Sequence, residues 1–163
     1  MILGAGGHGR VVADAALAAG AWSRVCATDR SAARCQGELL PGVPLLPLAE
    51  ALALADAAFH VAIGSAADRE REAAALRGRT LATVIHPSAA VSPHAALEPG
   101  CLVAAQAVVA PGASLGACVI VNHGAVVDHD VEVGAFSHVA PRAALGGGAR
   151  VGRRPAPRAA RHG

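Results

Sequence analysis

The chain has 163 residues, enough for one compact domain or two small ones, and 53% of them are hydrophobic although only 2% are aromatic. Ala, Val and Leu must therefore build the core, and such small aliphatic side chains suit stacked, repetitive layers better than a globule centred on aromatic residues. The net charge of +2 arises in the last fourteen residues, because residues 1–149 hold nine Arg against twelve acids, so a basic nucleic-acid-binding surface on the body of the chain is excluded.

The first half of the chain alternates between strand and helix patterns. Hydrophobic residues at helical spacing, such as Val12, Ala15, Ala16 and Ala19, indicate a helix over residues 10–19. Further helices are predicted at 48–55 and 66–76, and strands at 1–3, 24–28, 58–63 and 82–85. This order is typical of a small Rossmann-like α/β domain, which we predict to span residues 1–82.

A glycine-rich loop follows the first predicted strand. Gly4, Gly6 and Gly9 fit the pattern G-x-G-x-x-G, and Asp29 lies twenty residues beyond Gly9. Backbone N–H groups and a helix N-terminus in such a loop can receive a phosphate or pyrophosphate. An NAD-binding oxidoreductase is one interpretation, although His8 is unusual in an NAD site and about 80 residues leave little room for a six-stranded dehydrogenase sheet. A purely structural glycine turn is another interpretation.

The second half of the chain has a six-residue repeat. Every sixth residue from Ile85 onward is Ile, Leu or Val, and the residue two positions earlier is small. The aliphatic positions are Ile85, Val91, Leu97, Val103, Val109, Leu115, Val121, Val127, Val133, Val139, Leu145 and Val151. Gly and Pro fall between them, as in Pro99–Gly100. A period of six with turn residues between apolar positions does not fit the period-two alternation of an ordinary β-sandwich.

The repeat predicts a left-handed parallel β-helix over residues 83–153. Each six-residue unit would form one side of a triangular prism, so eighteen residues close one coil and each aliphatic side chain stacks on the one eighteen residues away. The small residue is expected to let the chain bend at the corner. The pattern fails at Pro157, and we expect residues 154–163 to be a disordered tail.

Several polar residues lie outside the inward register and should therefore point away from the prism. They are Asn122, His123, Asp128, His129, Asp130 and His138. His129 is bracketed by two Asp residues, an arrangement that raises the pKa of an imidazole and suits a general base. His123 and His138 fit a catalytic or a solvated role equally well, and His60, His86, His94 and His162 are interpreted as structural or solvated. No histidine spacing favours a zinc site, the other chemistry considered, so no metal is expected.

The four cysteines form no C-x-x-C pair. We interpret them as reduced thiols, and with no signal peptide and no apolar run of membrane-spanning length we expect a cytoplasmic protein that does not enter the membrane.

The loop Gly4-Ala-Gly-Gly-His-Gly9 and the set Asn122, Asp128-His129-Asp130 and His138 together resemble the NeuD/PglD family of bacterial sugar O- and N-acetyltransferases. The resemblance covers residues 1 to about 153. It implies that the N-terminal domain binds a nucleotide-linked sugar, with Gly6, Gly7, His8, Asp29 and Gly64 at the matching positions.

The resemblance also implies a homotrimer with acetyl-CoA in the groove between neighbouring β-helices. His129 would be the general base and Asp130 would support it, while His138 would contact the acetyl donor and Asn122 matches an active-site asparagine. The repeat ends about three coils earlier than in family members. A sugar-binding or trimer-forming module without acetyl transfer is therefore the alternative to an active enzyme.

Overall fold

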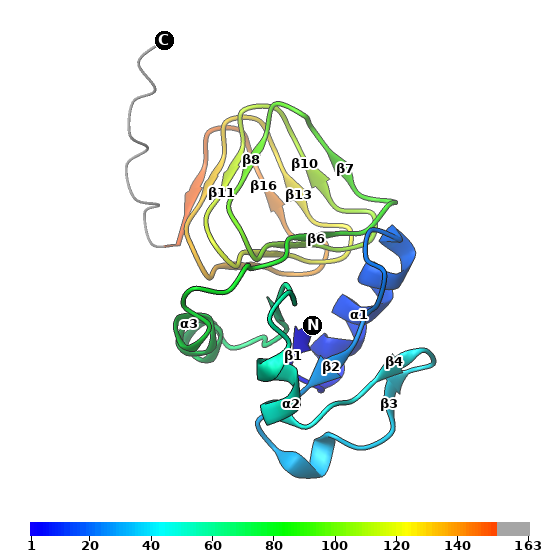
Figure 1. Cartoon of the computed structure of the whole chain (residues 1–163). Helices are drawn as coiled ribbons and strands as arrows, with labels where there is room; N and C mark the ends of the chain where they lie inside the picture. Colours follow the sequence, from blue (N-terminus) through cyan, green and yellow to red (C-terminus); the bar gives the residue numbers. More distant parts are fainter. Residues whose placement is uncertain (153–163) are drawn as a thin grey trace.

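The structure is a computed structural model that describes residues 1–152. An α/β part lies against one side of a β-helix, and the long axis of α1 (Gly7–Ala19) runs close to the first strand of the β-helix (Figure 1). The predicted tail, 154–163, and the last residue predicted for the β-helix lie outside the described residues. No helix within residues 1–152 is long and apolar enough to cross a membrane.

The α/β part is built around a parallel three-stranded sheet with strand order β2-β1-β5. Ile2 pairs with Ala27 on one side and with His60 on the other. Buried apolar residues of α1, among them Val12 and Ala16, pack in the same cluster as Ile2. The other elements are β1 (Ile2–Leu3), β2 (Ala27–Thr28), η1 (Ala32–Arg34), β3 (Glu38–Leu40), β4 (Val43–Pro44), α2 (Leu48–Ala53), β5 (His60–Val61) and α3 (Ala66–Ala75).

Two details of this half differ from the sequence prediction. The first helix begins at Gly7 rather than at residue 10, because Gly6 serves as its N-cap and the last turn of the glycine loop is already helical. The strand predicted at 82–85 does not join the α/β sheet. Its core, β6 (Val84–Ile85), pairs with β9 (Leu102–Val103) and so begins the β-helix, because Ile85 is the first inward residue of the repeat.

The β-helix has four coils, and every strand pairs in parallel with the strand eighteen residues away, as Val103 does with Val121. All twelve predicted aliphatic positions are the second residue of a two-residue strand. The parallel β-helix and its register are thereby confirmed. After β6 and β9 the strands are β7 (Ala90–Val91), β8 (Ala96–Leu97), β10 (Val108–Val109), β11 (Ser114–Leu115), β12 (Ile120–Val121), β13 (Val126–Val127), β14 (Glu132–Val133), β15 (His138–Val139), β16 (Ala144–Leu145) and β17 (Arg150–Val151).

The corners of the prism bend at a residue that the sequence pattern did not single out. From Leu97 to Leu145, the residue three positions after each inward aliphatic has a positive φ, between 54° and 83°. These residues are Gly100, Gln106, Gly112, Cys118, Gly124, Asp130, Phe136, Arg142 and Gly148. The small residue that follows points into the core, as Ala113 and Ala125 show by their complete burial. Small residues are therefore needed to fill the narrow corner, and the preceding residue makes the bend.

The outward residue of each strand gives the three sheets different surfaces. The domain face (β6, β9, β12, β15) presents Val84, Leu102, Ile120 and His138. The apolar face (β7, β10, β13, β16) presents Ala90, Val108, Val126 and Ala144. The polar face (β8, β11, β14, β17) presents Ala96, Ser114, Glu132 and Arg150. The first three residues of the domain face share a hydrophobic cluster with α1 and β1, so the α/β part covers this face.

Candidate functional site

A pocket of about 420 Å³ opens at the carboxyl ends of the α/β strands. All five residues predicted for nucleotide-sugar binding line it, namely Gly6, Gly7, His8, Asp29 and Gly64. Parallel α/β sheets bind ligands at this edge, since the loops there leave backbone N–H groups and helix N-termini free. The tertiary structure thus brings the predicted binding residues together from three separate loops.

The glycine loop is shaped by sterics at two positions. Gly4 has φ of 120°, and a Cβ there would lie 2.6 Å from the carbonyl oxygen of Ala62. A Cβ on Gly9 would overlap the carbonyl group of Gly4. These two glycines let α1 start directly against β1 and β5. A Cβ on Gly7 would meet nothing within 4 Å and one on Gly6 would meet only Arg34 Nη1 at 3.8 Å, so these two glycines line the pocket without steric need for glycine.

Asp29 ties the glycine loop to the end of β2. Its Oδ2 accepts a hydrogen bond from the backbone N–H of Ala5 at 2.9 Å, and its Oδ1 accepts one from Ser31 at 2.9 Å. An Arg34 guanidinium nitrogen lies 3.9 Å from Oδ2. Asp29 therefore holds the loop in shape while it lines the pocket.

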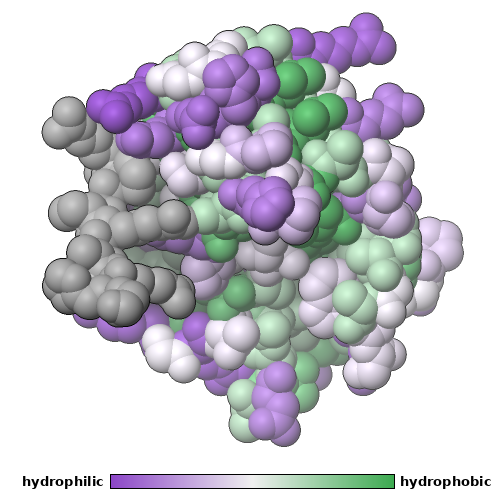
Figure 2. All heavy atoms as spheres, turned by 90° about the horizontal axis from the view of Figure 1, so that it is seen from above, coloured by the Kyte–Doolittle hydropathy of each residue, from purple (hydrophilic) through white to green (hydrophobic). Residues whose placement is uncertain are grey.

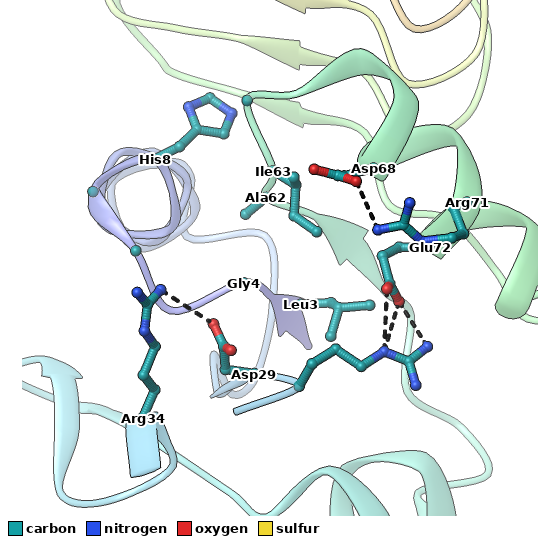
Figure 3. Close-up of a pocket in the computed structure, with 14 residues that line it drawn as sticks. Leu3, Gly4, His8, Asp29, Arg34, Ala62, Ile63, Asp68, Arg71 and Glu72 are labelled. Carbon is teal, nitrogen blue, oxygen red and sulfur yellow. Dashed lines mark hydrogen bonds and ion pairs between the residues drawn. The ribbon is translucent and has the colours of Figure 1, made fainter. Parts of the chain in front are cut away.

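Three arginines and three carboxylates surround the pocket (Figure 3). Arg30 forms a bidentate pair with the buried Glu72, with Nη2 2.7 Å from Oε2 and Nε 3.1 Å from Oε1. Arg71 donates to Asp68 at 2.6 Å. These two pairs are hydrogen-bonded, whereas Arg34 and Asp29 are separated by 3.9 Å. Arg34 is therefore the pocket cation that can approach a bound anion without breaking a hydrogen-bonded ion pair.

At the inner side of the pocket, His8 meets the β-helix. Its ring lies 6.5 Å from the ring of His138, the last outward residue of the domain face. Burial, followed by the nearby His138 and Arg69, lowers the pKa of His8 to about 4, and its buried Nε2 has no hydrogen-bond partner among the described residues. His138 Nε2 lies 3.0 Å from the side-chain amide of Asn122, which can donate to it. Burial, then Arg69, lowers the pKa of His138 as well. Two neutral imidazoles and an amide therefore lie where the pocket meets the β-helix.

Arg69 of α3 is fully buried at the same junction, although the sequence pattern did not select it. Its guanidinium donates to the carbonyl oxygens of Ile63 and Gly64 beside the pocket, at 2.6 and 2.9 Å. It also donates to the carbonyl oxygens of Cys118, Phe136 and Ser137 in the β-helix. A single side chain thereby connects the pocket wall to the turn that precedes His138.

His129 and Asp130 form a second polar group on the β-helix. His129 Nδ1 lies 3.0 Å from Asp130 Oδ2, and both side chains are largely exposed. The hydrogen bond to Asp130, and then the charge of Asp128, raise the pKa of His129. With Nδ1 bound to the carboxylate, Nε2 is the nitrogen that can accept a proton.

The structure separates these two groups. His129 and Asp130 lie at the corner between the apolar and polar faces, since they follow β13 and precede β14. In a three-sided prism that corner is opposite the domain face, as the places of β6, β11 and β13 show (Figure 1). His8, Asn122 and His138 lie together on the side of the domain face. His138 comes nine positions after His129 in the sequence, which is half of an eighteen-residue coil, so the two side chains lie on opposite sides of the prism. Within one chain the pair of His129 and Asp130, called the dyad below, therefore faces away from the pocket.

The charged pocket residues that sequence reasoning missed include Arg34 of η1 and Arg71 of α3. They lie in segments rich in charge, where composition does not distinguish a pocket-lining side chain from a solvated one. Within residues 1–152 no group of three or more His, Cys, Asp and Glu side chains could hold a metal ion.

Comparisons with known proteins agree on one family. The model described as the PglD N-terminal domain matches residues 1–76. The acetyltransferase domain of PglB from Neisseria gonorrhoeae, solved with acetyl coenzyme A, is 39% identical with a TM-score of 0.83, over 92% of this chain and 74% of that one. A histidine-to-alanine mutant of GDP-perosamine N-acetyltransferase from Caulobacter crescentus, solved with CoA and GDP-perosamine, is 32% identical with a TM-score of 0.80, over 91% and 71%.

WeeI from Acinetobacter baumannii shares the fold at 20% identity, with a TM-score of 0.76 over 91% of this chain and 70% of that one. No curated protein matches the chain. Two solved acetyltransferases at 32–39% identity thus share the fold over 91–92% of this chain. The chain belongs to the family of hexapeptide-repeat acetyltransferases that carry a PglD N-terminal domain.

Proposed function

We propose that this protein transfers the acetyl group of acetyl-CoA to the amine of a nucleotide-linked amino sugar, with His129 as the general base. The observation that carries the proposal is the His129–Asp130 pair, which leaves Nε2 of an exposed, basic imidazole free on a scaffold of the acetyltransferase fold. The relative solved with acetyl coenzyme A supports that donor, and the N-acetyltransferase solved with GDP-perosamine supports an amine acceptor over a hydroxyl.

Because the dyad and the pocket lie on opposite sides of one prism, we propose that each active site combines two copies of the chain. The pocket, His8 and His138 of one copy would hold the sugar nucleotide and the acetyl donor. His129 and Asp130 would come from a neighbouring copy. This arrangement agrees with the homotrimer predicted from the family resemblance, in which acetyl-CoA lies between neighbouring β-helices.

The apolar face supports assembly through the β-helix. Its outward residues are all Ala or Val, and Val126 remains 36% exposed. On the side of the molecule turned away from the α/β part, hydrophobic side chains gather beside strongly hydrophilic ones (Figure 2). The polar face, by contrast, carries a Glu132–Arg150 ion pair at 3.3 Å. A second copy packed on the apolar face would adjoin the corner that carries His129.

The proposed chemistry needs one positioned base. His129 Nε2 removes a proton as the amine nitrogen attacks the thioester carbonyl carbon, so that the C–N bond forms while the C–S bond breaks. The CoA thiolate leaves and takes the proton back from the imidazolium, which Asp130 stabilises while it exists. Because a thioester is already activated, positioning and a moderate base are sufficient.

The first experiment measures CoA release from acetyl-CoA with UDP- and GDP-linked amino sugars as acceptors. His129→Ala should lower kcat by about 10²- to 10⁴-fold, the usual contribution of a general base, while the assembly remains intact. Near-normal turnover by this variant would remove His129 from the mechanism. Binding of NAD in place of sugar nucleotides would favour the oxidoreductase interpretation. Binding of sugar nucleotide without acetyl-CoA would favour a sugar-binding module.

A second experiment tests whether the site is shared between copies. His129→Ala and a pocket-defective variant, Asp29→Ala, are each expected to be inactive as pure assemblies. In mixed assemblies some sites would combine an intact pocket with an intact His129, so co-expression should restore part of the activity. Mixed assemblies with no activity would show that pocket and base act within one chain.

A further inference from the structure

The corner that carries His129 and Asp130 has glycine at the equivalent position one coil before and one coil after. Asp130 is the residue of its corner with a left-handed backbone conformation (φ 58°). The residues stacked on it in the neighbouring coils are Gly112 (φ 76°) and Gly148 (φ 71°). Five of the nine left-handed corner residues in this β-helix are not glycine, Gln106 and Arg142 among them. The backbone bend alone therefore does not require glycine next to Asp130.

The space around Asp130 gives a specific reason for glycine at position 112. A Cβ on Gly112 would come within 3.0 Å of Asp130 Oδ1 and would lie 3.3 Å from its Cγ. The Asp130 main chain is held by the hydrogen bond from its N–H to the carbonyl of Pro111, at 3.2 Å. Since the backbone is tied to the coil that contains Gly112, the carboxylate is the part that must move. Its movement would separate Oδ2 from His129 Nδ1, which now lie 3.0 Å apart.

We propose that Gly112 is a positioning residue for catalysis, because the missing side chain at this corner keeps the Asp130 carboxylate against the His129 imidazole. The inference rests on the proposed function, in which His129 is the base. Gly112 is a turn residue without a polar side chain, and it lies eighteen residues before Asp130. In this inference it nevertheless helps to set the orientation and basicity of His129.

The electrostatics give the expected direction of the effect. The hydrogen bond from Asp130 is the largest cause that raises the pKa of His129. Displacing the carboxylate should therefore lower the pKa of His129 and leave the ring free to rotate. A base with a lower pKa is deprotonated at lower pH but accepts the substrate proton less strongly. In the pH–rate profile, the rise in activity that follows deprotonation of His129 should thus move to lower pH, while the rate on the plateau falls.

The test compares Gly112→Ala with Gly124→Ala in the full chain. Gly124 is a left-handed corner glycine with φ of 63°, and the nearest atom to a Cβ there is Arg142 Cγ at 3.6 Å, so both variants share the backbone strain. An NMR titration of the His129 ring, assigned with His129→Gln, measures its pKa without requiring activity. Gly112→Ala should lower that pKa and reduce kcat/KM by about tenfold or more, whereas Gly124→Ala should leave both near the parent values.

A double variant identifies the cause. In an Asp130→Gly background, adding Gly112→Ala should have no further effect on the His129 pKa or on kcat/KM, because the carboxylate that it displaces is absent. If Gly112→Ala alone does not fold, the double variant should fold, since the clash is relieved. A double variant that also fails to fold, or an unchanged His129 pKa in a folded Gly112→Ala protein, overturns the proposal. Unchanged turnover in His129→Ala would instead refute the proposed function. The NMR titration would still show whether Gly112 affects the pKa of His129.

Discussion

Arg69 Nε donates to the carbonyl oxygen of Cys118 at 2.9 Å, across 49 residues and from the α/β part to a corner of the β-helix. The same guanidinium reaches the carbonyls of Ile63 and Gly64 at the pocket. Its acceptors are neutral carbonyls, and burial lowers the pKa of Arg69. This contact fixes how the pocket at the carboxyl ends of the α/β strands sits against the coil that carries His138.

Replacing Arg69 should therefore weaken the junction of the two parts. Arg69→Met removes charge-assisted hydrogen bonds and leaves several buried carbonyls without donors, so we expect a loss of about 2–4 kcal/mol in the free energy of unfolding. Urea unfolding measures the change. Arg71→Met, on the same helix but in an exposed pair with Asp68, is the matched control and should cost less than about 1 kcal/mol. Equal losses in the two variants would contradict the role of Arg69.

Val126 should be needed for assembly if copies meet through the apolar face. Val126→Arg places a charge in the middle of that face, and we expect sedimentation equilibrium to show a monomer and the acetyltransferase activity to be lost with the assembly. Ser114→Arg, on the polar face, is the control and should leave the assembly intact because Glu132 lies next to position 114 in the sheet. A trimeric Val126→Arg protein would direct the search for the interface to another face.

His60 should make the stability depend on pH in the weakly acidic range. It is buried, its Nδ1 donates to the Ala82 carbonyl at 2.9 Å, and burial lowers its pKa from 6.5 to about 4. The unfolded chain binds a proton below pH 6.5 while the folded chain resists it until about pH 4. Stability is therefore fully present above pH 6.5 and falls by up to about 3 kcal/mol as the pH drops toward 4.

Unfolding measured from pH 7.5 to 4 should show this loss, and His60→Gln should reduce the slope, although His8 contributes in the same direction. The exposed His94→Gln serves as the control and should keep the parent slope. A His60→Gln protein with the full parent slope would assign the pH dependence to other groups.

The inward aliphatic residues should differ in importance along the β-helix. Val121 is completely buried, so Val121→Ala should cost about 2 kcal/mol from lost burial and the cavity that remains. Val151, in the last described strand, is 37% exposed, and Val151→Ala should cost about 0.5 kcal/mol or less. Thermal unfolding at one fixed pH compares the two, and similar costs would argue against the graded burial.

The sequence by itself determined the β-helix, since a repeat of six residues specifies at once which side chains point inward and which strands pair. Val103 and Val121 are paired because eighteen residues close a coil, and any other register would expose the whole aliphatic series. The glycine loop was equally predictable, because Gly4 and Gly9 occupy places that no other residue can fill. The His129–Asp130 contact followed from two adjacent residues at one turn.

Only the tertiary structure decided how these parts meet. The α/β part covers the face with Val84, Leu102 and Ile120, and this places His138 beside His8 and leaves His129 at the opposite corner. Arg69 binds carbonyl oxygens from separate segments, and carbonyl groups are the same at every residue, so no sequence pattern can mark them as acceptors. Gly112 matters through the side chain stacked on it one coil later, a relation that exists only once the coils are closed.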